Sequence, residues 1–143
     1  MLVEHIMTKH VVSISMDATL ETIRDLFNHC NFHHLVVVDD KKIVGVVSDR
    51  DLLRAISPFA GTASERTIDA ACLRKRAHQI MSRAVIAARP DMDASEAAMI
   101  LINKRISCLP VTNDAGACLG IVTWRDLLRW SLEQFAERMK SAA

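Results

Sequence analysis

The chain has 143 residues, half of them hydrophobic, so it can bury one full core or two small fused lobes. Its 18 Lys and Arg residues balance 17 Asp and Glu residues, and no basic tract is present, which argues against nucleic-acid or anionic-membrane partners. No apolar run approaches the roughly 20 residues that span a bilayer, and the N-terminus, with acidic Glu4, lacks the apolar core of a secretory signal. We therefore expect a globular cytoplasmic protein.

The first third of the chain predicts one compact unit of alternating elements. After Ile6-Met7 comes a short extended piece over 11–13, and then an amphipathic stretch from Leu20 to Phe27. The segment "HLVVVDDKKIVGVVS" predicts two strands around an Asp-Asp-Lys-Lys turn, because β-branched residues flank the polar turn. A helix is expected to begin at Asp49. The predicted order is β-α-β-β-α.

The middle of the chain, residues 58–77, predicts a structured linker. Pro58, Gly61 and Ser64 are typical of a loop, while the spacing of Ile68, Ala71 and Cys72 favours a helical return toward His78. We therefore place the domain boundaries at 4–57 and 78–132, with the linker between them.

The last part of the chain repeats the first pattern. Ile80-Met81 precedes an extended piece over 85–87, an alanine-rich amphipathic stretch over 94–102, two strands in "CLPVTNDAGACLGIVT", and a helix from Trp124. That helix continues through a C-terminal extension, residues 133–143, and one apolar face along it carries Leu128, Leu132, Phe135 and Met139. This face could pack on its own lobe or on a partner subunit, and the sequence leaves both open.

The two patterns are a tandem duplication. Aligning residues 6–54 with 80–129, with one extra residue near Ala117, gives 14 identities in 49 pairs. Two similar lobes with approximate twofold symmetry are the expected packing, in an α/β (α+β) fold.

The four cysteines, at positions 30, 72, 108 and 118, form no C-x-x-C pair and no zinc-like spacing with histidine, so we expect reduced thiols. His29 and His33 are four residues apart and would share a metal on one helix. However, His33 leads directly into the strand-like "LVVV", which predicts that the helix ends first. We therefore predict no metal site.

The duplicated motifs bring a family into view. Ile-Met at the start, "LVV" or "LPV" in the middle, and "GVVSDRDLL" or "GIVTWRDLL" at the end resemble a tandem CBS-domain pair, a Bateman module, over residues 4–57 and 78–132. The resemblance implies a regulatory protein that binds adenosine-containing ligands in clefts between its two repeats. It also implies a homodimer shaped as a flat disc of four repeats. With little chain beyond the second repeat, we expect a stand-alone protein that acts on a partner in trans.

The repeated S/T-x-x-D motif has two interpretations. Ser48 and Thr123 each stand where a strand ends and a helix begins, and the Asp three residues later can close a capping box. That role needs no ligand.

The same motif also fits a ribose-phosphate. The helix start, the hydroxyl and Arg50 or Arg125 would attract phosphate, while Asp51 or Asp126 would accept hydrogen bonds from ribose hydroxyls. Two copies of the motif favour this nucleotide-binding hypothesis over a cap alone.

The position of the base is implied by the resemblance alone. It places adenine against Thr8, Val11 and Val12, or against Ser82, Val85 and Ile86, with Leu35-Val36 or Leu109-Pro110 on its other face. His34 would reach phosphate, although a plain role at the entry of a strand is the alternative. Ordinary core packing is the alternative for the apolar residues.

The repeats differ beside the two motifs. Val36 stands where the second repeat has Pro110, and Asp49 stands where it has Trp124. The extra negative charge of Asp49 predicts that the Thr123/Asp126 site binds anionic phosphate better than the Ser48/Asp51 site.

Three classes of function are weighed. A regulatory module that senses AMP, ADP or ATP and signals through dimer conformation to an unknown effector is favoured, with S-adenosylmethionine or NAD(H) as alternative ligands. A structural dimerisation module without ligand is the second. An enzyme has little support, since no nucleophile elbow, P-loop or Rossmann glycine pattern occurs and the chain has four glycines. No cofactor is expected beyond the adenosyl ligand.

Overall fold

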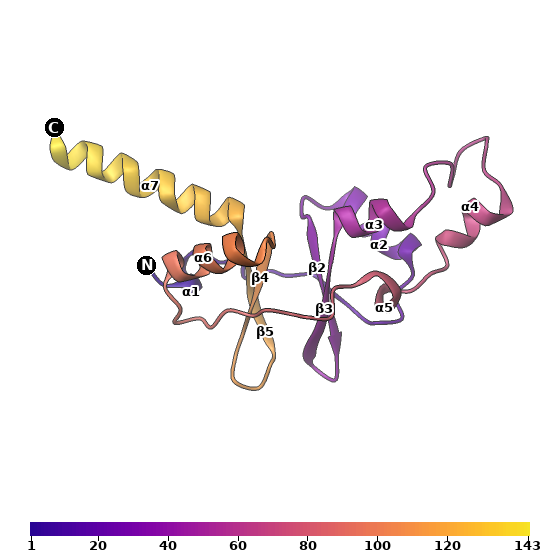
Figure 1. Ribbon diagram of the computed structural model, residues 1–143, viewed down its shortest axis with the longest axis horizontal. Coiled ribbons are helices and arrows are strands. Elements are labelled where there is room, and N and C mark those ends of the chain that lie inside the picture. Colours follow the sequence, from indigo (N-terminus) through magenta and orange to yellow (C-terminus); the bar gives the residue numbers. More distant parts are fainter. The chain divides into compact units, whose positions relative to one another are not determined.

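The computed structural model describes all 143 residues, which form two compact units (Figure 1). Unit 1 comprises residues 1–11 and 86–143, and unit 2 comprises residues 12–85. The units therefore differ from the sequence repeats, because the first segment of each repeat lies in the unit that holds the body of the other repeat.

Unit 2 is built on a three-stranded sheet. β1 (Ser13–Ile14) runs parallel to β2 (His34–Asp39), which pairs antiparallel with β3 (Lys42–Ser48). Asp40 and Lys41 form the hairpin turn with φ of 47° and 63°, the left-handed conformation that a two-residue hairpin loop requires.

Unit 2 contains four helices. They are α2 (Leu20–His29), α3 (Asp49–Ala55), α4 (Thr67–Cys72) and α5 (Ala77–Ile80). The core is made of fully or almost fully buried side chains from the sheet and from α2, α3 and α5: Leu20, Ile23, Leu35, Val37, Val47, Leu52, Ala77 and Met81.

Unit 1 has the same plan with a smaller sheet. It contains α1 (Val3–Ile6), α6 (Ala94–Lys104), the antiparallel pair β4 (Cys108–Thr112) and β5 (Cys118–Thr123), and α7 (Trp124–Ala142). Ala94 and Ala97 are completely buried, as close helix contact requires. The mixed α/β fold of two repeated units is thus confirmed.

The strand predicted over 85–87 does not form. Only a single parallel bridge joins Ala88 to Val111. In unit 2 the equivalent strand is held in part by the N–H of Val36, which donates to Val12 O at 3.3 Å. Pro110 occupies the position of Val36 and has no N–H, so unit 1 lacks this bond.

A glycine fixes the first segment of each repeat in its unit. A Cβ at Gly120 would lie 2.7 Å from Met7 Sδ and 2.8 Å from the carbonyl oxygen of Thr8, and one at Gly45 would lie 2.5 Å from Met81 Sδ. The Ile-Met motif and the glycine of "G-hydrophobic-Val" therefore occur together because one packs against the other.

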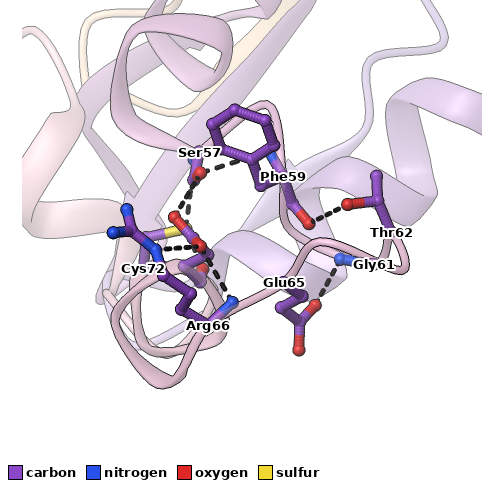
Figure 2. A network of polar contacts seen from close by, with 8 residues as sticks. Ser57, Phe59, Gly61, Thr62, Glu65, Arg66 and Cys72 are labelled. Atoms are coloured by element: carbon purple, nitrogen blue, oxygen red, sulfur yellow. Dashed lines mark hydrogen bonds and ion pairs between the residues drawn. The ribbon is translucent and has the colours of Figure 1, made fainter.

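The predicted helical return in the linker is confirmed as α4, and Figure 2 shows the polar network around it. The buried carboxylate of Asp69 accepts hydrogen bonds from Ser57 Oγ (2.7 Å), Arg66 N (2.9 Å) and Arg66 Nε (3.3 Å). The Ser57 hydroxyl, followed by the Arg66 N–H, lowers the pKa of Asp69. Ser57 N also donates to Cys72 Sγ, so the linker is fastened to the end of α3.

The C-terminal extension does not pack on its own unit. Leu132, Phe135 and Met139 on α7 are 62%, 64% and 72% exposed, so the first of the two alternatives for this face is wrong. No helix of the chain, α7 included, has the length and apolar character needed to span a membrane.

Candidate functional site

In unit 1 the repeated motif forms a closed capping box at the start of α7. The carboxylate oxygen Asp126 Oδ2 accepts from Thr123 N (2.8 Å) and from Thr123 Oγ1 (2.8 Å). The backbone N–H of Asp126 donates to Thr123 Oγ1 at 3.4 Å. Thr123 ends β5 in an extended conformation, so strand and helix are joined by this one residue.

In unit 2 the equivalent box opens α3. Asp51 Oδ2 accepts from Ser48 N at 2.8 Å, and Ser48 Oγ accepts from Asp51 N at 3.1 Å. The helix starts predicted at Asp49 and Trp124, and the capping interpretation of both motifs, are therefore confirmed.

The two boxes differ in burial and in polar contacts. Asp126 is 9% exposed, whereas Asp51 is half-buried. The Thr123 hydroxyl also donates to the carboxylate of its box, a bond that Ser48 does not share. Unit 1 therefore presents the more enclosed carboxylate.

The charges beside the boxes also differ. The guanidinium carbon of Arg125 lies 5.2 Å from the centre of the Trp124 ring, a cation–π contact that holds the cation beside the start of α7. In unit 2, Asp49 occupies the position of Trp124, and its Oδ2 lies 2.9 Å from Nδ1 of His33. Arg50, the counterpart of Arg125, is exposed. His33, singled out from the sequence only as a possible metal ligand with His29, is thus a hydrogen-bond partner of Asp49.

Thr8 and Ser82, the polar residues of the two extended pieces, each pair with a strand from the other sequence repeat. Thr8 N donates to Ile121 O and accepts at its own carbonyl from Ile121 N, both at 2.9 Å, which puts Thr8 beside the strand that ends at Thr123. Ser82 exchanges the same pair of bonds with Val46, two residues before Ser48. The sequence had grouped Thr8 with the first repeat and Ser82 with the second.

The apolar residues of the extended pieces divide in the same way. Val11 and Ile86 belong to unit 1, and Val12 and Val85 belong to unit 2. All four are half-buried, and Ile86 and Val12 pack against the cores of their units.

The strand residues expected against the base are more enclosed. Leu109 and Pro110 have no appreciable accessible side-chain surface, so core packing is the role that the structure gives them. His34 is half-buried and lies directly opposite Ser48 in the β2–β3 ladder.

The cysteines and histidines form no metal centre in the structure. None of the four cysteines forms a disulfide, and no three potential ligands cluster. α2 ends at His29 and β2 begins at His34, so the predicted helix break between His29 and His33 is confirmed. His29 Nδ1 instead contacts the carbonyl oxygen of Asp25 at 2.7 Å.

Comparison with known proteins gives a family match in two segments. The CBS-domain profile matches residues 3–58 and 77–133. A CBS domain-containing protein of Dictyostelium discoideum is 33% identical over 129 residues, covering 89% of this chain and 88% of that protein. An inosine-5'-monophosphate dehydrogenase of Nitrosopumilus maritimus is 33% identical over 123 residues, which are 85% of this chain. The match covers only 22% of the length of that dehydrogenase.

Two solved structures are similar in both fold and sequence. A CBS domain pair in complex with 5'-methylthioadenosine and S-adenosyl-L-methionine has a TM-score of 0.76 and 28% identity, covering 94% of this chain and 98% of the other. The cytosolic domain of the Mg²⁺ channel MgtE in complex with ATP has a TM-score of 0.66 and 29% identity, covering 86% of this chain and 46% of the other. Together with the duplicated glycine, Ile-Met and capping-box motifs, these matches show that the chain belongs to the CBS-domain family and contains a tandem pair of CBS domains.

Proposed function

We propose that this CBS pair is a regulatory module that binds adenine nucleotides at its two capping boxes and signals their presence through the conformation of a homodimer. The observation that carries the proposal is the duplicated box, in which a carboxylate, a hydroxyl and a helix start meet at the end of a strand in both units. Support also comes from the similar CBS domain structures, whose ligands, ATP, S-adenosyl-L-methionine and 5'-methylthioadenosine, all contain adenosine.

At each box, the ribose and the phosphate of the nucleotide would contact different groups. The cap employs Oδ2 of Asp51 and of Asp126, and we assign Oδ1 of each carboxylate to a ribose hydroxyl. Such a charge-assisted hydrogen bond is worth about 1.5–3 kcal/mol. Phosphate would lie toward the helix start and Arg50 or Arg125.

The adenine would lie against the extended piece that pairs with the same strand. Thr8 would therefore serve the Thr123 box and Ser82 the Ser48 box, since each pairs with the strand that leads into that box. Of the residues nearby, Val11 and Ile86 in unit 1 and Val12 and Val85 in unit 2 have partly accessible side chains. Leu109 and Pro110 would support the strand from the core, and His34 would approach phosphate beside Ser48.

The two boxes are proposed to be unequal. Asp49 places a carboxylate at the first helical position beside Ser48, which repels phosphate, whereas Arg125 is held beside Thr123 by its contact with Trp124. Multiply phosphorylated ligands would therefore bind first at the Thr123/Asp126 box.

A thermal-shift panel tests the proposal. AMP, ADP, ATP, S-adenosylmethionine and NADH are compared with a guanine nucleotide, each over a range of concentrations. A ligand at 100 times its Kd stabilises the fold by about 2.7 kcal/mol, which raises Tm by several degrees. At least one adenosine-containing ligand is expected to do so. No shift with any of them would favour a purely structural dimerisation module, for which the fully closed caps need no ligand.

A further inference from the structure

The outer face of α7 carries a regular row of exposed apolar side chains. Leu128, Leu132, Phe135 and Met139 follow one another at spacings of four, three and four residues, and they are 50%, 62%, 64% and 72% exposed. We call these four residues the α7 seam. Trp124, one turn before the seam, is 49% exposed.

Only the first half of α7 packs against the rest of unit 1. Leu127 is buried and Trp130 packs partly against the core, while every residue from Phe135 to Ala143 is exposed. In Figure 1 the last turns of α7 project away from the other elements of unit 1. An isolated helical segment of this length is marginal in water, so these turns need a partner to be stable.

The spacing of the seam indicates which partner fits. Apolar residues that alternate at intervals of three and four give the 3.5-residue period of a two-helix coiled coil, narrower than the face with which a helix covers a globular core. The positions that flank the middle of the seam are Ser131 and Ala136, which are small and uncharged. Arg129 and Arg138 flank its two ends, so two such helices can approach most closely at the middle of the seam.

The exposed area is sufficient for a specific contact. At their observed exposures, the seam and Trp124 leave on the order of 600 Å² per chain, and two copies would bury about 1,200 Å², the lower end of standard protein interfaces. We propose that the α7 seam is a self-association surface, on which the α7 helix of a second copy of this chain docks. This inference deepens the proposed function, on whose homodimer it rests, by naming the surface that holds the two copies together.

The same helix connects this surface to the candidate nucleotide site. α7 begins at the Thr123/Asp126 box and continues without a break for 19 residues, about 28 Å. A ligand that shifts the first turn of α7 would therefore shift the seam as well, because both belong to one continuous helix.

Sedimentation velocity over a range of protein concentrations tests the seam. The wild type is compared with L132E/F135E, with the conservative variant F135L, and with I68E as a matched control. Ile68 is 71% exposed on α4 and lies outside the seam, so I68E makes the same kind of change elsewhere. We expect wild type, F135L and I68E to be dimeric and L132E/F135E to be monomeric, with its dimer dissociation constant raised at least a hundredfold.

Two results would overturn the proposal. One is an L132E/F135E variant that remains dimeric. The other is a wild type that is monomeric at every concentration, including one that instead co-sediments with phosphatidylglycerol vesicles, which would make α7 a membrane-surface helix. Because the substituted side chains are exposed, the variant should keep its far-ultraviolet circular dichroism apart from the last turns of α7.

The nucleotide panel, repeated on L132E/F135E, separates this inference from the proposed function. A monomeric variant whose Tm still rises with an adenosine ligand supports both. If no ligand shifts the wild type but the variant has lost the dimer, the seam stands and the nucleotide proposal fails.

Discussion

α3 and α7 begin with nearly the same sequence and the same capping box but have different lengths and surroundings. α3 ends after seven residues, at the linker that Asp69 fastens down, whereas α7 continues for 19 residues. Leu53 and Leu128, equivalent residues of the two repeats, are 69% and 50% exposed, but only Leu128 is followed by a row of further apolar residues. The duplicated part of each repeat therefore builds the box, and the sequence after it decides what each helix contacts.

The two capping boxes likewise share their geometry and differ in their surroundings. Each closes through an Asp Oδ2 and a backbone N–H at 2.8 Å, yet one is flanked by a cation held on an aromatic ring and the other by a carboxylate paired with a histidine. Geometry is common to both units, and electrostatics distinguishes them.

The largest expected difference between the units is at the repeated glycine. Gly120→Ala should lower the free energy of unfolding by about 3 kcal/mol, and Gly45→Ala by about 1 kcal/mol. The new methyl group in unit 1 would meet the carbonyl oxygen of Thr8, which is fixed by its bonds to Ile121, whereas the two atoms nearest Gly45 are Sδ and Cγ of Met81, which a change of rotamer can move. Urea unfolding monitored by circular dichroism measures both, and equal losses would contradict the account.

The caps should differ by a smaller amount. Ser48→Ala removes one cap and is expected to cost about 1 kcal/mol of stability. Thr123→Ala should cost about 2 kcal/mol, because it also takes a hydrogen-bond donor from the buried Asp126 carboxylate. Thermal unfolding of both variants tests this, with Thr123→Ser as the control that keeps the hydroxyl and should remain near wild type. A Ser48→Ala variant as unstable as Thr123→Ala would show that the extra bond contributes nothing.

The stability that the N-cap of α6 contributes should depend on pH in the acid range. The Ser95 hydroxyl and N–H, with the N-terminal ammonium, lower the pKa of Asp93 to about 2 from an ordinary value of 3.8. Because the folded pKa is depressed, its stabilisation is complete above about pH 4 and is lost as pH falls toward 2. Asp93→Asn should flatten stability against pH in that window, measured by urea unfolding at each pH. Asp17→Asn is the control, and an identical slope in the two variants would refute the assignment.

The smallest effect concerns His34 in unit 2. If its imidazolium contacts phosphate, the affinity for a phosphorylated ligand should fall about threefold as pH rises from roughly 5.5 to 8. His34→Gln should remove that dependence without changing the affinity at pH 8. Titration calorimetry at several pH values decides, and a flat wild-type profile would exclude His34 from the site.

Much of the fold could be predicted because its signals are local. The helix starts at Asp49 and Trp124 follow from a capping residue at the end of a β-branched run, and both hairpins follow from polar turns between such runs. The family followed from the order and duplication of these motifs.

The features that were not predicted depend on tertiary contacts. Periodicity does not reveal which strand an extended piece joins, so the pairing of Thr8 with Ile121 and of Ser82 with Val46 could not be foreseen. A signal was nevertheless present, because Ile-Met and the glycine recur together in both repeats and each Met lies against the glycine of the other repeat. Likewise, the lost strand near Ala88 depends on Pro110, whose missing N–H matters only once its partner is known.

Titration calorimetry of the adenosine ligand with the largest thermal shift, carried out on wild type, Asp126→Asn and Asp51→Asn, tests the central claim most directly. The claim is that the two capping boxes are unequal nucleotide sites. For a multiply phosphorylated ligand, Asp126→Asn should abolish or weaken the tighter binding event by about tenfold or more, and Asp51→Asn should affect only the weaker one. Equal losses in the two variants, or affinities that neither variant changes, would contradict it.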